Sequence, residues 1–251
     1  IGIRQVADGG RPFEPWFNAP PKTRQRLAMF CLLSSKNADD ALRETLRYTR
    51  NDRFPKLPGH VTFTSHYHMA VAVEAMKRNF SGRPHFVDAF KNMGVNAVHI
   101  PDFHGDGHQH DPGPLRLPEM QAMFKECRRL SDPDFLLIPG EELSGILGMN
   151  EKGKHPGHWM TLFPKPVYFI QKPATDRPLV SDDPQFGKVY RAGSREEMIQ
   201  LLKKENGLGW VAHPRIKASS WTPDIFRKED FYLDDFWLGA AWKQMPGDLS
   251  R

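Results

Sequence analysis

The sequence has too little cysteine to build a disulfide scaffold or a cysteine-rich metal centre. Its 251 residues include only two cysteines, Cys31 and Cys127, and neither belongs to a Cys-x-x-Cys pair. Disulfide-stabilised small domains and thiolate zinc modules both need several closely spaced cysteines. Both classes are therefore excluded, and cysteine usage leaves the cellular compartment open.

Long apolar runs and blocks of basic residues are also lacking. No stretch approaches the roughly 18 apolar residues that a membrane span needs, and the short apolar run at 27–33 has no cleavage-site pattern behind it. The net charge of +5 is spread along the chain without a run of five or six Lys or Arg. We therefore expect no membrane segment, little affinity for nucleic acid, and a small-molecule substrate, with anions preferred.

What is present is typical of one large α/β domain. Residues 1–25 are rich in Gly, Pro, Arg and Asn and are interpreted as a linker or the remnant of an upstream region, followed by a domain over 26–251. From there, short apolar runs alternate with segments of helical period. Strands are expected at 27–33, 61–65, 95–100, 135–139, 159–163, 167–170 and 209–212, and helices at 37–50, 68–77, 86–93, 117–130 and 194–206. This alternation predicts a largely parallel sheet, either a barrel or an open sheet.

Histidines and carboxylates lie beside the ends of five of these expected strands. They are His66 and His68 in "SHYHM", Asp102 and His104 in "PDFHG", Glu141 and Glu142 in "PGEEL", His158 in "GHWMT", and His213 in "VAHPR". The carboxyl ends of parallel strands share one face, where barrel enzymes build their active sites. We therefore expect these side chains to converge.

Imidazole and carboxylate groups together are the ligands that Zn²⁺, Mn²⁺ and Fe ions prefer. A lone histidine at a strand end is more often a hydrogen-bonded or surface residue, so the prediction depends on the whole set. A glutamate can bridge two metals, and two metals roughly 3.5–4 Å apart generate a strong nucleophile and stabilise the leaving group. The set therefore predicts hydrolysis of a phosphoester, ester or amide by a metal-bound hydroxide.

The order of these motifs resembles that of the PHP family, the polymerase and histidinol phosphatase domains. The family's strand ending in His-x-His, its Asp-His, its Gly-x-Glu, a histidine and an Ala-His-Pro are matched over about residues 60–215. The short gap before "GHWMTL" looks most like the branch related to carbaryl hydrolase. The resemblance implies a distorted (β/α)₇ barrel, incomplete at its C-terminal end, that hydrolyses a substrate with two or three divalent ions, Zn, Mn or Fe.

The resemblance also implies roles for individual residues. The expected metal ligands are His66, His68, Asp102, His104, Glu142, His158 and His213. The Gly-x-Glu spacing selects Glu142 rather than Glu141 as the bridging carboxylate. His104 or a water molecule would carry the proton.

Two features depart from the family pattern. Phe103 separates Asp102 from His104, which are adjacent in the family. The family ends on an Asp-x-His, whereas no histidine follows His213 in this sequence. Two explanations fit: the sequence stops before the last strand and helix, with further domains in the parent chain, or a metal position has been lost.

Other polar residues near the motifs have weaker interpretations. Arg215 and Lys217 could hold an anionic substrate group, although a solvated loop is the more common explanation for such residues. His60 and His99 are interpreted as structural. Three further histidines, His108, His110 and His155, lie in loops that could cover the site.

Two alternatives to the hydrolase stay open. The chain could be a catalytically impaired module that binds a metal or a ligand within a larger protein, as the missing Asp-x-His suggests. An amidohydrolase-type barrel also uses His-x-His on a strand, but it often has a carboxylated Lys at a mid-chain strand end, and the sequence has no Lys at such a position.

Overall fold

The computed structural model describes residues 44, 58–68, 82–104, 116–143, 157–171, 177–215 and 219–241. It does not describe the side chains of residues 85 and 102–104. The expected strand at 27–33, the helix at 68–77 beyond its first residue, and the proposed boundary near residue 25 lie outside these ranges. The expected helix at 37–50 is represented by Glu44 alone, which is helical.

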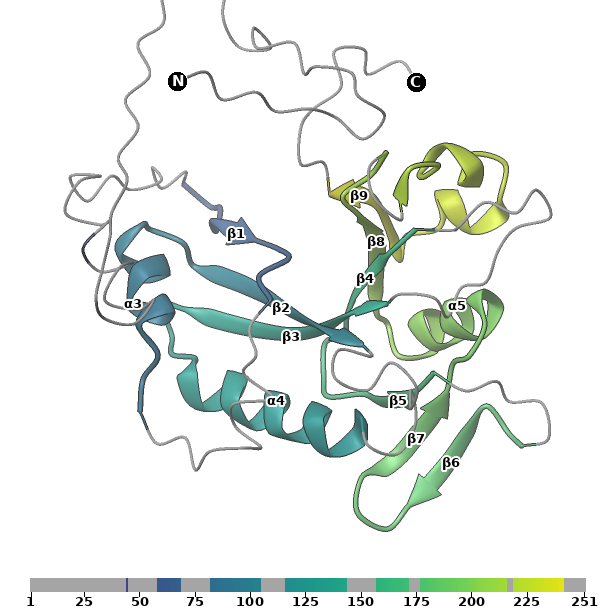
Figure 1. The fold of residues 1–251 in the computed structure, drawn as a ribbon, viewed down its shortest axis with the longest axis horizontal. Coiled ribbons are helices and arrows are strands. Elements are labelled where there is room, and N and C mark those ends of the chain that lie inside the picture. Colours follow the sequence, from purple (N-terminus) through teal and green to yellow (C-terminus); the bar gives the residue numbers. More distant parts are fainter. Residues whose placement is uncertain are drawn as a thin grey trace, which may run out of the picture.

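Six strands form one strongly curled sheet that carries the site. Their order is β1-β2-β3-β4-β8-β9. The pairs β1–β2, β2–β3 and β8–β9 are parallel, whereas β4 runs antiparallel to both β3 and β8. Figure 1 shows the sheet turning sharply between β3 and β4, so that it encloses a concave face like half of a barrel. The bounds are β1 Phe63–Thr64, β2 Ala97–His104, β3 Leu136–Leu143, β4 Trp159–Leu162, β8 Leu208–Ala212 and β9 Trp237–Ala241.

The helices and a smaller sheet lie on the outer side of this curl (Figure 1). The smaller sheet has the order β5-β7-β6 and lies beside α4, with β5 parallel and β6 antiparallel to β7. The helices of the described ranges are α3 His85–Asn92, α4 Arg116–Leu130, α5 Arg195–Lys204 and the short 3₁₀ turns η2 Asp224–Phe226 and η3 Asp230–Leu233. The strands of the smaller sheet are β5 Tyr168–Ile170, β6 Val180–Asp183 and β7 Gly187–Arg191. None of these helices is long and apolar enough to cross a membrane.

Local sequence explains where α5 begins. The side chain of Ser194 accepts a hydrogen bond from the backbone N–H of Glu197, and the Glu197 carboxylate accepts one from the backbone N–H of Gly193. This reciprocal arrangement satisfies N–H groups that a helix start leaves without partners. The capping pattern read from the sequence is therefore confirmed.

Two apolar clusters hold the helices against the sheet. One joins α3 and α4 to β2 and β3 and contains Val98, Ile100, Met123 and Leu137. The other is rich in aromatic rings around Trp159, which packs at 4.5 Å between ring centroids against Trp237. Burial of this apolar surface holds the outer helices against the sheet.

The structure corrects the prediction of a (β/α)₇ barrel. In the described ranges a half-barrel sheet is covered by three α-helices, and its middle strand, β4, is antiparallel. Local apolar periodicity identifies a strand but not its direction. Strand β4 runs back along β3 in the opposite direction, although the sequence pattern favoured a parallel neighbour. Strands β6, β7 and β9 were not predicted from the sequence.

Two strands are longer than their sequences suggested. Strand β2 continues to His104 and β3 to Leu143, whereas the predicted strands end at Ile100 and Pro139. Proline lacks an N–H for the strand ladder and normally lies at edges or strand ends. Here β4 pairs with β3 only from Gly140 onward, so Pro139 faces no partner on that side in the register.

Candidate metal centre

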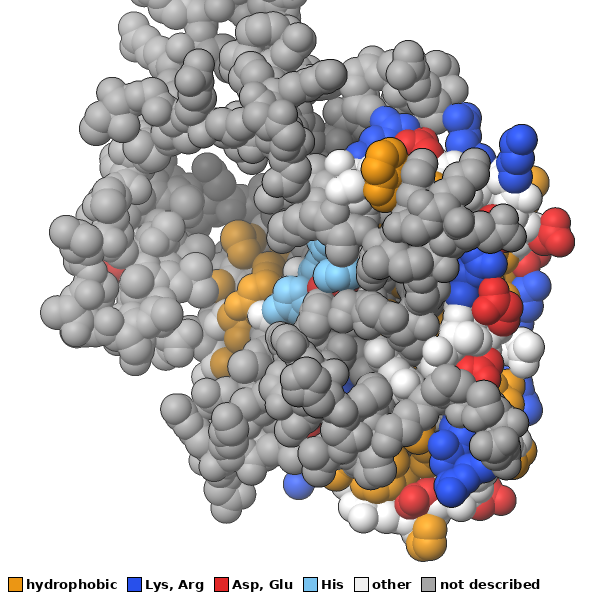
Figure 2. Space-filling view, turned by 45° about the vertical axis from the view of Figure 1, so that its right-hand side comes forward, with side chains coloured by type: hydrophobic (Ala, Val, Ile, Leu, Met, Phe, Trp, Pro, Cys, Tyr) orange, Lys and Arg blue, Asp and Glu red, His pale blue; other side chains and the backbone are white. Residues whose placement is uncertain are grey.

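Side chains from four of the predicted motifs meet at one edge of the curled sheet. His66 and His68 follow β1, Glu142 lies near the end of β3, and His213 follows β8. His158 precedes β4, but β4 runs antiparallel, so the start of this strand lies at the same edge as the ends of the others. Figure 2 shows histidine side chains gathered in one group, next to hydrophobic side chains.

Glu142 lies at the centre of this group, with its side chain only 2% exposed. Its Oε2 accepts hydrogen bonds from Nε2 of His66 at 2.9 Å and lies 2.8 Å from Nε2 of His68. Its Oε1 lies 2.7 Å from Nδ1 of His158 and 3.2 Å from Nε2 of His213. Each carboxylate oxygen therefore faces two imidazoles, one pair on either side.

The histidines also contact one another. The Nε2 atoms of His66 and His68 are 2.9 Å apart and so point at the same place. The rings of His66 and His213 are stacked with centroids 5.6 Å apart, and those of His158 and His213 meet edge to face at 5.1 Å. The donor atoms of His66, Glu142 and His213 all lie within 4.8 Å of one another. Two nitrogens and a carboxylate oxygen at this spacing could hold a metal ion.

The histidines change the ionisation of Glu142. Burial alone would raise the pKa of this carboxyl, but hydrogen bonds from His158, His213, His66 and His68 outweigh burial and hold the pKa far below its usual range. Glu142 is thus a permanent carboxylate, as a metal ligand must be.

Two of the candidate ligands have unusual backbone conformations. His66 has φ 68° and His213 has φ 33°, in the left-handed region that residues other than glycine rarely adopt. Arg215, two residues further on, has φ 64°. Such strain persists only where surrounding contacts impose it, and it concentrates at functional sites.

A loop after β8 holds the backbone of this group in place. Ser219 Oγ accepts the backbone N–H of His158, and the carbonyl oxygens of Ser219 and Thr222 accept the backbone N–H of Arg215. Gly157, with φ 86°, packs so closely here that a Cβ atom would lie 2.8 Å from the hydroxyl oxygens of both Ser219 and Thr222. Sequence reasoning missed these residues, because single hydroxyl and glycine residues carry no motif.

The second predicted motif is only partly described. In the register, Phe103 pairs with Glu142, and Asp102 pairs with Glu141. The side chains of Asp102 and His104 lie outside the described part, so their role as ligands stays a prediction. The residues at 108, 110, 155 and 217 also lie outside it.

Other predicted polar residues have clear surroundings. Arg215 forms a bidentate ion pair with Asp224, with N···O distances of 3.1 and 3.0 Å, at a partly exposed position. Glu141 points away from the histidines and pairs with Arg116, in agreement with the choice of Glu142. His99 is fully buried, donates from Nε2 to the carbonyl oxygen of Thr161, and is structural as predicted. Burial lowers its pKa to about 4.

Comparisons with known proteins give no further guide to the class of this site. No family model, no curated protein and no solved structure matches the chain. The conclusions about function therefore rest on the sequence and on the geometry of the group around Glu142.

Proposed function

We propose that this protein is a metal-dependent hydrolase whose ion is held by His66, Glu142 and His213. The observation that supports this proposal is the position of Glu142, a buried carboxylate with two imidazoles facing each of its oxygens. A stable core rarely buries a carboxylate among four histidines, because the desolvation cost is large unless a partner charge is present. A divalent ion is such a partner.

His68 and His158 would complete the set of ligands. A carboxylate with an imidazole pair on each side matches a bridging ligand, so two or three ions of Zn, Mn or Fe fit the PHP resemblance. A bound ion would supply an activated water and polarise a phosphoryl or carbonyl oxygen. The chain would orient the ligands and supply the fixed charge of Glu142. Arg215, two residues after His213, would bind an anionic group of the substrate.

Metal content tests the first half of the proposal. Plasma mass spectrometry would compare the wild type, the double variant His66→Ala/His68→Ala and the control His60→Ala, which removes an exposed histidine bonded only locally to Pro58. We expect one or more equivalents of Zn, Mn or Fe in the wild type and the control, and a loss in the double variant. Absence of metal from all three after incubation with excess ions would refute the proposal.

Turnover tests the second half. Metal-loaded protein would be assayed on a phosphodiester and a carboxylic ester of p-nitrophenol, beside Glu142→Gln. We expect metal-dependent hydrolysis of at least one of them, at least about 100-fold slower in the variant, since metal ligands contribute to both binding and rate.

A metal-binding module without turnover is the second candidate. One observation favours it: Phe103 rather than an acidic residue is paired with Glu142 in the register. Tight metal binding that depends on Glu142, with no hydrolysis across a broad set of esters, would select this candidate.

A further inference from the structure

A buried ion pair lies on the opposite side of β3 from the histidines. Arg116 donates from Nε to Oε2 of Glu141 at 3.2 Å and from Nη2 to Oε1, so the contact is bidentate. Its Nη1 also donates to Glu119 at 3.0 Å. The side chains of all three residues are 5% exposed or less. The pair thus ties the start of α4 to the end of β3.

Arg116 occupies an unfavourable position for its own helix. It is the first residue of α4, where the helix dipole is positive and favours acidic side chains. Burying a guanidinium is costly as well, and a buried ion pair adds little net stability compared with well-packed apolar residues. Helix stability therefore does not explain Arg116, and its contact with Glu141 needs another reason.

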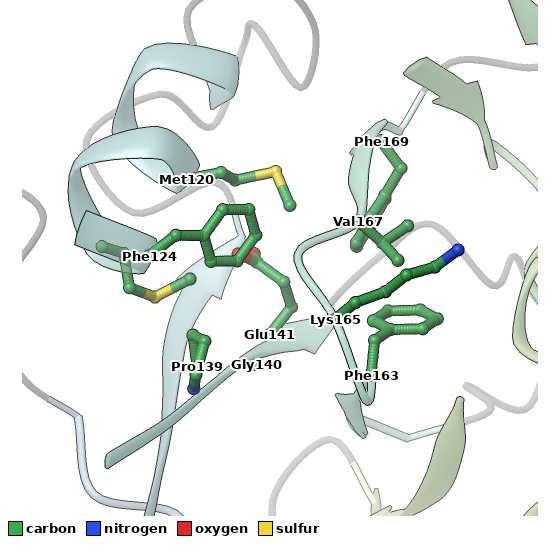
Figure 3. Close-up of a pocket in the computed structure, with 10 residues that line it drawn as sticks. Met120, Phe124, Pro139, Gly140, Glu141, Phe163, Lys165, Val167 and Phe169 are labelled. Atoms are coloured by element: carbon green, nitrogen blue, oxygen red, sulfur yellow. The ribbon is translucent and has the colours of Figure 1, made fainter. Parts of the chain in front are cut away.

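Glu141 and Glu142 are chemically alike and adjacent, and they point to opposite faces of β3. Figure 3 shows the side chain of Glu141 extending towards the helix that carries Met120 and Phe124, at a small pocket lined largely by apolar side chains. Glu142 points to the concave face. Because strand side chains alternate with a period of two, a shift of one residue at this end would exchange the two carboxylates.

We infer that Arg116 is a positioning residue that selects which of these two glutamates faces the histidines. By pairing with Glu141 on the outer face, Arg116 fixes the register of β3 and leaves Glu142 on the concave face. This use, the specification of register, is the best-supported role of a buried ion pair. The effect on metal binding rests on the proposed function, whereas the effect on the orientation of Glu142 does not.

NMR spectra of the histidine rings in the metal-free chain test the orientation of Glu142 directly. The variant Arg116→Met would be compared with the wild type and with Glu142→Gln, which shows the spectrum without the carboxylate. Arg129→Met is the matched control, because Arg129 pairs with Glu126 at 2.7 Å in the same helix. We expect the resonances of the rings near Glu142 to shift in Arg116→Met, and to stay unchanged in the control.

Zinc titration supplies the second measurement. We expect Arg116→Met to bind zinc about tenfold or more weakly, in line with the loss of groups that orient metal ligands. The double variant Arg116→Met/Glu141→Met should regain most of the affinity, because no second carboxylate then competes for the concave face. A purely structural role would lower the melting temperature of Arg116→Met and leave the zinc affinity of the folded variant at the wild-type value.

The outcomes are distinct. Wild-type ring spectra and zinc affinity in a folded Arg116→Met would overturn the role of Arg116. If the wild type binds no zinc, the proposed function fails, and the ring spectra still decide on Arg116. If Arg116→Met does not fold, Arg116→Lys takes its place. Lysine keeps the charge and loses the bidentate contact, so a smaller shift of the histidine ring resonances in the same direction is expected.

Discussion

Ser219 Oγ accepts the backbone N–H of His158 at 3.1 Å, across 61 positions of sequence. The same serine accepts the backbone N–H of Arg215 through its carbonyl oxygen. It thereby joins the segment before β4, which carries His158, to the loop after β8, which carries His213. Ser219 is fully buried, so its contacts are shielded from water.

Substitution Ser219→Ala removes the acceptor for the His158 backbone N–H. A buried donor left without a partner costs about 1–3 kcal/mol of folding stability. We expect a loss of this size in urea unfolding, together with severalfold weaker metal binding as His158 loses its support. Ser181→Ala, at an exposed position in β6, is the control. Equal metal affinity in both variants would contradict the role of Ser219.

The two sides of Glu142 predict how many ions bind. If one ion lies at each carboxylate oxygen, His68→Ala and His158→Ala should each lower the metal content by about one equivalent, since each removes a ligand from one side only. Glu142→Gln should affect both ions. Plasma mass spectrometry measures the number of ions bound to each variant, and competition with a chromogenic chelator measures their affinity. A wild type that binds a single equivalent would show that the histidines share one ion.

His99 makes folding stability depend on pH. Its pKa falls from 6.5 to about 4 through burial, so the unfolded chain binds more protons between these values. Its contribution is therefore complete above about pH 6.5 and is lost as pH falls towards 4, by about 3 kcal/mol in total. Urea unfolding at several pH values measures this. His99→Gln should flatten the dependence in this window, and His60→Gln should leave it unchanged; parallel curves for wild type and His99→Gln would contradict the assignment.

Arg215 is paired with Asp224, so an anion would have to compete with this carboxylate for the guanidinium. Asp224→Asn should release Arg215 from this pair and tighten inhibition by inorganic phosphate about tenfold. Arg215→Met should weaken this inhibition, because guanidinium groups bind phosphate in a bidentate manner. Arg195→Met, which alters a partly exposed pair with Glu196, is the control. Identical phosphate inhibition in all variants would show that Arg215 belongs only to the loop.

The sequence predicted the elements whose signals are local. Helix α4 follows from apolar residues at helical spacing, and the start of α5 follows from Ser194 and Glu197. The choice of Glu142 over Glu141 also agrees with the geometry, although it came from the family spacing. The convergence of the motifs was expected for a parallel sheet, and it holds because the antiparallel β4 brings the start of its strand, with His158, to the same edge.

What the sequence determined by itself was the inventory of the site: five histidines, Asp102 and Glu142 placed beside strands, in an α/β chain with too little cysteine for a thiolate centre. Only the tertiary structure decided that the sheet is half of a barrel with an antiparallel middle strand, that Arg116 holds Glu141 away from the histidines, and that Ser219 connects two segments of the site. These features depend on contacts between residues far apart in the chain. Local periodicity carries no information about such contacts, because strand direction, register and ion pairs are selected by the packing of the whole fold.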